Sequence, residues 1–284
     1  MKNSILSKIL LHVESFPGLP KTGAKLMTVL DEPDVSLAQI EKILNYDPGL
    51  TANFLKLANS PYFGIPSKVS SIKQAIVSLG IKRLKQIVLA TSTSAVLDKA
   101  VPGYDLEPGD LWRHSIMVSI SALQLAKFKK LSEPNDIFTS ALLHDIGKLV
   151  LSRFVKEHVG AIKEIVSKGV PLEVAENMVL ETDHAEIGAQ ILTQWSFPTD
   201  VVNAVRFHHN PDIIHNKDVR IDLVCLANMF CQMNGMNGES STDLSSISPA
   251  LRKRLGFEKD KLESIYNQIT KWAKDFSAEL TFDL

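Results

Sequence analysis

The residues best able to support chemistry are five histidines in four separate segments, together with one aspartate and one lysine. The histidines are His114, His144, His184, His208 and His209. His144 opens the motif HDIGK, so Asp145 and Lys148 stand beside it within an otherwise apolar stretch, ALLHDIGKLV. Burying an ionisable pair there costs free energy unless a metal, a phosphate or neighbouring side chains pair with it. Imidazole and carboxylate together suit Zn, Fe, Mn or Ni, and their spacing alone does not choose among these metals.

The spacing of the HDIGK motif is compatible with a metal site. Residues 136–157 are predicted to be helical, and adjacent helical residues point about 100° apart. His144 and Asp145 can therefore contact two neighbouring metals, or one metal from two directions. Lys148 lies on the same helical face as His144, where its ammonium group could hold a phosphate oxygen.

The remaining histidines are predicted at helix ends. His184 follows Asp183 and would open a helix, where the positive end of the helix dipole favours anions. His208 and His209 would close a helix before an Asn-Pro dipeptide. A single histidine on a helix is more often packed or hydrogen-bonded than a ligand. Its recurrence in four helical segments, one with an HD pair and a helical lysine, keeps a metal site open as the alternative.

Composition excludes several classes of protein. The chain has 284 residues, of which 45% are hydrophobic and 22% charged, as is usual for a soluble globular protein. A formal net charge of −1 gives no general attraction to nucleic acid or to a membrane. No apolar run approaches the roughly 18–20 residues of a membrane span. Polar residues interrupt the N-terminal segment and no cleavage site follows, so we expect a helix there and not a signal peptide. Cys225 and Cys231 do not form a disulfide framework, which favours a cytoplasmic protein.

The periodicity of apolar residues predicts an all-α protein. Ser36 and Gln39 have the spacing of a capping box, and Asp47-Pro48 is typical of a helix start. A helix over 72–79 is expected to end at Gly80, with another following. Beyond it we expect helices at 110–130, 136–157, 160–168, 171–180, 184–195, 199–209 and 219–232, and an amphipathic helix near the C-terminus.

Three regions are expected along the chain. Residues 98–109 are rich in Pro, Gly and acidic residues and are the best candidate boundary. We therefore expect an N-terminal helical subdomain at 5–100 and a second helical subdomain at 101–232. Residues 233–284 would comprise a flexible surface loop over 233–248 followed by C-terminal packing helices.

Several segments resemble a known family. HDIGK, with a histidine upstream and a histidine pair downstream, looks like the HD superfamily of metal-dependent phosphohydrolases. FPGLP at 16–20, the stretch at 31–64 that includes DPGLTANFLKLANSPYFG, and SIKQAIVSLG at 71–80 closely resemble the HDOD domain, a bacterial signalling relative. The resemblance covers roughly residues 5–232. It implies an N-terminal helical bundle packed on an HD-like helical bundle. Within NSPYFG, the polar and aromatic side chains would either face a partner or pack at a helix end, and packing is favoured.

The resemblance also implies roles for the histidines. Many HDOD domains have lost the HD ligands, whereas this sequence is similar in its histidines to the HD-GYP phosphodiesterases, which cleave cyclic dinucleotides with two or three metals. Asp145 would bridge the metals, and Lys148 would bind a substrate phosphate, which makes these two the candidate catalytic residues. The implied metal ligands are His114, His144, Asp145, His184, His208 and His209.

Two features depart from the HD-GYP pattern. The last ligand of that pattern is an Asp, and here Asn228 stands at the matching position. Asp222 lies on a different helical face and is not expected to replace it. HHNPD is also not followed by the GYP signature. Asp110 stands where some HD-GYP members have a Glu ligand.

The expected function is that of a bacterial signal-transduction or regulatory HDOD module that binds one or two divalent transition-metal ions (Fe, Mn, Ni or Zn). Its partner would be a signalling protein or a small phosphorylated ligand, with no nucleic acid and no membrane. The alternative is a metal-dependent phosphohydrolase or phosphodiesterase acting on a nucleotide or cyclic dinucleotide. In a third interpretation the histidine cluster is a relic that binds metal only structurally, or not at all.

Overall fold

The computed structural model describes residues 4–32, 34–60, 63–65, 68–131, 135–213, 218–234 and 244–279, without the side chains at 135 and 272–279. Within these ranges the regular structure is helical, and Val101 and Leu106 form an isolated antiparallel bridge. The predicted all-α class is therefore confirmed. None of the described helices is both long enough and apolar enough to cross a membrane.

The chain forms two compact units. The smaller unit comprises Leu19–Val96 and Gln268–Leu284, and the larger unit comprises Met1–Gly18 and Leu97–Asn267. The N-terminal helix thus groups with the larger unit, although the sequence had joined it to the N-terminal subdomain. The domain boundaries at 100 and 232 remain predictions.

In its described residues the smaller unit contains successive helices, several of whose ends follow from local sequence. They are α2 (Lys21–Leu30), α3 (Leu37–Asn45), α4 (Pro48–Ala58) and α5 (Ile72–Leu97). Ser36 and Gln39 form the expected capping box at the start of α3. Asp47 caps α4 by accepting a hydrogen bond from the Leu50 amide at 2.9 Å. At Gly80 the backbone has φ of 71°, so the helical conformation is interrupted there, as predicted.

The NSPYFG segment packs inward where it is described. The Asn59 side chain donates to the Val69 carbonyl at 2.8 Å and accepts from the Val69 amide at 2.7 Å. Phe63 is buried. These contacts agree with the packing interpretation, while Pro61 and Tyr62 lie outside the described residues.

The larger unit contains the remaining described helices. They are α1 (Ile5–Glu14), η2 (Pro102–Tyr104), α6 (Asp110–Phe128), α7 (Asn135–Leu143), α8 (Gly147–Glu157), α9 (Val159–Ser167), α10 (Leu172–Leu180), α11 (His184–Gln194), α12 (Thr199–Arg206), α13 (Val219–Met233), η3 (Leu244–Ser246), α14 (Pro249–Leu255) and α15 (Lys259–Glu279), whose last turns belong to the smaller unit.

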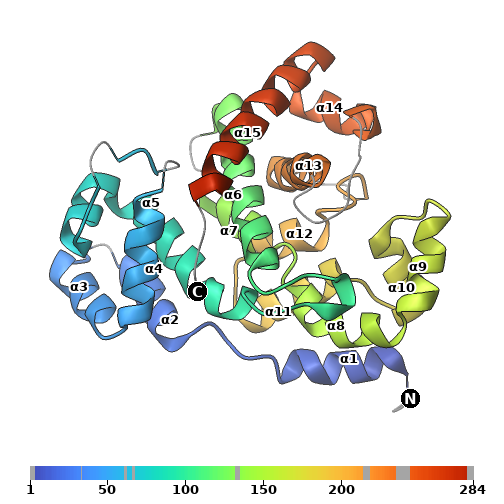
Figure 1. The fold of residues 1–284 in the computed structure, drawn as a ribbon, viewed down its shortest axis with the longest axis horizontal. Coiled ribbons are helices and arrows are strands. Elements are labelled where there is room, and N and C mark those ends of the chain that lie inside the picture. Colours follow the sequence, from blue (N-terminus) through green and yellow to red (C-terminus); the bar gives the residue numbers. More distant parts are fainter. Residues whose placement is uncertain are drawn as a thin grey trace. The chain divides into compact units, whose positions relative to one another are not determined.

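Helix α6 is the core element of the larger unit. Residues on every side of it are buried, which is typical of a helix enclosed by others. It packs against α7 and α13, and α11 packs against α8 and α12 (Figure 1). These contacts bring the N-terminal part of α6, the α7–α8 junction and the ends of α11 and α12 into one region.

The predicted helix over 136–157 is wrong as a single element. Residues 144–146 form a turn between α7 and α8, so the HD pair occupies a junction and not a helical face. The periodicity does not reveal this break because the apolar residues continue on both sides of it.

The segment 98–109 is ordered and packs on α8 through η2. Gly103 lies so close to α8 that a Cβ atom there would be 2.2 Å from the Ser152 carbonyl oxygen.

The expected flexible loop over 233–248 is described at 233–234 and from residue 244 onward. Leu244–Ser246 form a 3₁₀ turn and Ile247 is buried, so this end of it is packed.

Candidate metal centre

The structure brings together the five histidines, Asp145 and Lys148. His114 lies on α6, Lys148 on α8, and His144 and Asp145 in the turn between α7 and α8. His184 is the first residue of α11, as predicted, and Asp183 caps this helix by accepting from the Glu186 amide. His208 and His209 follow the end of α12. Apart from His209, whose side chain is 20% exposed, these residues are buried.

Their nitrogen and oxygen atoms form two groups that share one carboxylate. The first contains His114, His144 and Asp145, and the second contains Asp145, His184, His208 and His209. Within each group the ligand atoms lie within 4.8 Å of one another. Two ligands of one ion bound at about 2.1 Å are on the order of 3–4 Å apart. Each group therefore has the composition and spacing to hold a metal ion.

Asp145 faces one group with each of its oxygens. Oδ2 lies 3.3 Å from Nε2 of His144 and 3.6 Å from Nε2 of His114. Oδ1 lies 3.4 Å from Nε2 of His184 and 3.8 Å from Nε2 of His208. Lys148 donates to Oδ2 at 2.9 Å. A single carboxylate is thus shared by the two groups that could each hold a metal ion.

The backbone orients two of the imidazole rings. Nδ1 of His144 donates to the Ala141 carbonyl at 2.7 Å, and Nδ1 of His208 donates to the Val205 carbonyl at 2.6 Å. Because a carbonyl oxygen only accepts, Nδ1 of each ring carries a proton, and in the neutral form of the ring Nε2 is the unprotonated nitrogen. Nε2 then presents its lone pair to the cluster, which is the form of histidine that binds a metal.

Glu176 performs the same task for His184, and the sequence did not reveal it. Its Oε2 accepts from Nδ1 of His184 at 2.7 Å and from the His184 amide at 2.9 Å. Its Oε1 accepts from the Tyr104 hydroxyl at 2.7 Å. Tyr104 lies in the segment expected to be a boundary, and Glu176 lies in a predicted helix. A glutamate at helical spacing from Leu172 and Leu180 was the only sequence signal.

The protonation states favour metal binding. Burial alone would raise the pKa of the Asp145 carboxyl, but His144 and Lys148 hold that pKa well below its usual range. Burial lowers the pKa of His114 to about 3 and also lowers the pKa of His208. At neutral pH the carboxylate is therefore ionised and these rings are neutral, as metal ligation requires.

His184 differs from the other rings in its ionisation. Burial would lower its pKa, but the adjacent Glu176 carboxylate raises it above the ordinary value. Glu176 in turn has a lowered pKa, because His184 outweighs the effect of burial. This pair fixes the orientation of the ring and increases its basicity toward a cation.

Two buried atoms test whether a metal fits. Among the described residues, Asp145 Oδ1 and His208 Nε2 have no hydrogen-bond partner. Nε2 of His184 and Nε2 of His209, in contrast, are hydrogen-bonded to each other at 2.8 Å. Buried polar atoms are rarely left unsatisfied. A cation beside Asp145 Oδ1 and His208 Nε2 would satisfy both atoms, so the residues fit a metal ion.

Asn228 reaches the first group from α13. Its Oδ1 lies 3.1 Å from Nε2 of His114. The residue that stands in place of the last Asp of the HD-GYP pattern therefore contacts a candidate metal ligand. The two carboxylates considered beside it lie elsewhere. Asp222 accepts hydrogen bonds from Arg254 at 2.8–3.1 Å, and Asp110 accepts one from Arg113 at 2.6 Å. Neither belongs to the two groups.

A close approach of two helices joins the groups. A Cβ atom on Gly147 would lie 2.0 Å from the His184 carbonyl oxygen and 2.6 Å from the Gly188 amide nitrogen. Only glycine therefore permits the start of α8 to contact the start of α11. This contact is what sets Asp145 against His184.

Comparisons with known proteins identify the family of the chain. The family model of the HDOD domain matches residues 16–211. The chain belongs to the HDOD domain family. An uncharacterized protein of Treponema pallidum is 28% identical over 232 residues, which are 81% of this chain and 44% of that protein. This chain thus spans less than half the length of that relative.

Two solved structures are similar over nearly the whole chain. An HDOD domain protein of unknown function from Geobacter sulfurreducens superposes with a TM-score of 0.79 at 22% identity, covering 98% of this chain and 99% of that one. A protein from Shewanella amazonensis, provisionally named a phosphohydrolase, superposes with a TM-score of 0.75 at 26% identity, covering 96% and 98%. Both likenesses support the HDOD fold.

We predict that Gly147→Ala destabilises the protein and weakens the metal site. The added methyl group pushes α8 away from α11, and such overpacking lowers the free energy of unfolding by about 1–3 kcal/mol. Gly160→Ala is the matched control, because it lies in α9 with nothing within 4 Å of its added Cβ. Urea unfolding measures the free energy of unfolding of both variants. Equal unfolding midpoints for the two variants would contradict the proposed close approach.

Proposed function

We propose that this protein is a cytoplasmic regulatory module of the HDOD family that binds two divalent transition-metal ions in its histidine cluster. The metal would be Fe, Mn, Ni or Zn. The observation that carries this proposal is the position of Asp145, with one oxygen facing each group of imidazoles. The state of the cluster would be passed to a signalling protein or read by a small phosphorylated ligand.

In this proposal the residues have separate tasks. His114 and His144 would hold one ion, and His184, His208 and His209 the other, with Asp145 shared between them. A bound metal would supply positive charge that attracts a phosphate group. Lys148 would neutralise part of the Asp145 charge and orient the carboxylate through its 2.9 Å hydrogen bond.

Hydrolysis of a phosphate ester is the second candidate function. It is favoured by Lys148, a buried ammonium group beside the cluster, and by the 26% identity to the Shewanella protein provisionally named a phosphohydrolase. Here Asp145 and Lys148 would be the catalytic residues. Asn228 weighs against this function, since a neutral amide is a weaker ligand than a carboxylate and one cation position would be less strongly held.

Metal content tests the proposal. Protein purified anaerobically without chelator is expected to contain close to stoichiometric transition metal by elemental analysis. The His144→Ala/Asp145→Ala variant should contain almost none. His158→Ala is the control, because His158 lies outside the cluster and its ring contacts the Phe154 carbonyl. Metal-free wild-type protein, or equal metal in parent and double variant, would overturn the proposal.

Asn228→Asp is expected to tighten the His114 position. A carboxylate in place of the amide adds a negative charge next to a cation, which we expect to raise the affinity by about 10-fold or more. Titration calorimetry with Mn²⁺ measures the affinity, and p-nitrophenyl phosphate turnover tests the hydrolase alternative. If neither affinity nor turnover rises, Asn228 does not occupy the ligand position assigned to it.

A further inference from the structure

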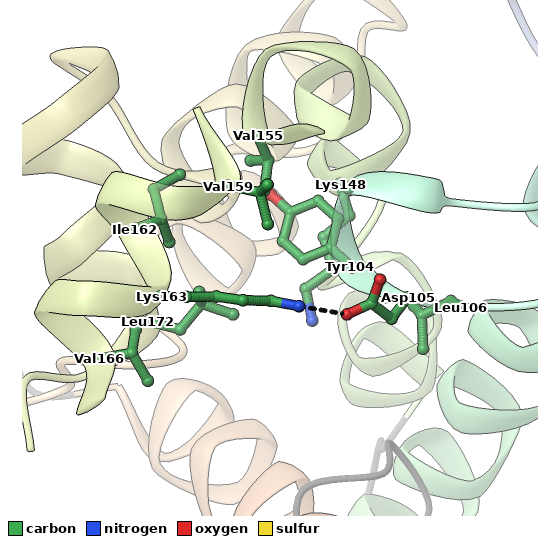
Figure 2. Close-up of a pocket in the computed structure, with 11 residues that line it drawn as sticks. Tyr104, Asp105, Leu106, Lys148, Val155, Val159, Ile162, Lys163, Val166 and Leu172 are labelled. Carbon is green, nitrogen blue, oxygen red and sulfur yellow. Dashed lines mark hydrogen bonds and ion pairs between the residues drawn. The ribbon is translucent and has the colours of Figure 1, made fainter. Parts of the chain in front are cut away.

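A pocket of about 180 Å³ lies beside the metal cluster in the larger unit. It is formed by η2 with the segment after it, and by α8, α9 and α10. Its apolar wall consists of Val155, Val159, Ile162, Val166 and Leu172 (Figure 2). Tyr104 lines it as well, and its hydroxyl is held by Glu176. An aromatic side chain anchored by its polar end provides an apolar surface against which a flat group can pack.

Among the described residues, two lysines and one carboxylate line the pocket. They are Lys148, whose charge is compensated by Asp145, and the pair of Lys163 and Asp105. Lys163 donates to Asp105 at 2.9 Å, as the dashed line in Figure 2 marks. The side chains of this pair are 66% and 73% exposed. An ion pair so exposed contributes little to stability, so Lys163 can turn toward another anion at small cost.

The size of the pocket limits the occupant. A cavity of about 150 Å³ accommodates a benzene ring. The pocket therefore matches one flat ring or a group of similar size, with an anionic substituent directed toward a lysine.

The pocket is also connected to the metal ligands. Tyr104 is the shared element, because its ring lines the pocket and its hydroxyl donates to Glu176. Glu176 holds both the ring and the amide of His184. Lys148 gives a second connection, since its Nζ lies 5.4 Å from the centre of the Tyr104 ring and 2.9 Å from Asp145.

We propose that this pocket is a binding site for a small organic anion with a single flat ring, and that the metal cluster senses its occupant through Tyr104. The binding site stands on the pocket alone, whereas the sensing rests on the proposed metal-binding function. The ring packs between Tyr104 and the aliphatic wall, and the anionic group pairs with Lys163.

Binding is tested with benzoate and phenylphosphonate, which distinguish a carboxylate from a phosphate-like anion, and with neutral benzyl alcohol. Titrations of the full chain use ligand-observed NMR. At least one of the two anions is expected to bind more tightly than the alcohol. Absence of binding by both anions, or equal affinity for the neutral alcohol, overturns the proposal.

Two variants test the location of the site. Val166→Trp should fill the mouth of the pocket and abolish binding, whereas Val174→Trp, at a similarly exposed position of α10 outside the lining, should not. Asp105→Asn releases Lys163 and should tighten anion binding about 3- to 10-fold, with no effect on benzyl alcohol. Equal binding by the two Trp variants, or no tightening in Asp105→Asn, places the probe elsewhere and overturns the site.

Sensing is tested separately by Mn²⁺ titration with and without the bound probe. Wild-type protein is expected to change its Mn²⁺ affinity by several-fold, and Tyr104→Phe, which keeps the ring but removes the hydroxyl, to lose that change. Probe binding with unchanged Mn²⁺ affinity overturns the sensing and leaves the site. Probe binding by a protein that takes up no Mn²⁺ identifies a failure of the metal proposal instead.

Discussion

Burial of the ionised Asp145 carboxylate is the constraint on which the arrangement of the larger unit depends. It is buried and ionised, and four imidazole nitrogens lie within 3.3–3.8 Å of its oxygens. Lys148 supplies one compensating charge, but Oδ1 has no hydrogen-bond partner in the described part of the chain. Breaking a buried charge pair by removing one partner costs about 3–5 kcal/mol, so the surrounding helices must hold their charges in a fixed arrangement. Cations shared between the carboxylate and the imidazoles would complete that arrangement.

Neighbouring helices fix this arrangement in two ways, through a close backbone contact and through hydrogen bonds to the histidine rings. The absence of a side chain at Gly147 lets α8 touch α11, which fixes the distance between Asp145 and His184. Glu176 on α10 then holds His184 by two hydrogen bonds and receives one from Tyr104. The histidine cluster and the adjacent pocket are thus joined by two hydrogen bonds, one from Tyr104 to Glu176 and one from His184 to Glu176.

The sequence predicted the all-α class and many helix ends because these depend on local features. The capping box at Ser36 and the break at Gly80 are examples. It also singled out the residues that gather in the cluster, since HDIGK and the other histidines are unusual in apolar or helix-end settings. It missed the turn within 136–157, because the apolar pattern continues through the break. Glu176 and Tyr104 were missed because their importance arises from tertiary contacts, 8 and 72 residues apart in the chain.

The most direct test of the account is electron paramagnetic resonance of the protein titrated with Mn²⁺. If Asp145 joins two cation sites, the fully loaded protein should give the spectrum of an exchange-coupled pair of ions. Asp145→Ala should abolish that coupling, leaving isolated ions or none. A six-line spectrum of isolated Mn²⁺ at every loading of the wild-type protein would contradict the bridging role of Asp145, and the cluster would then hold ions independently.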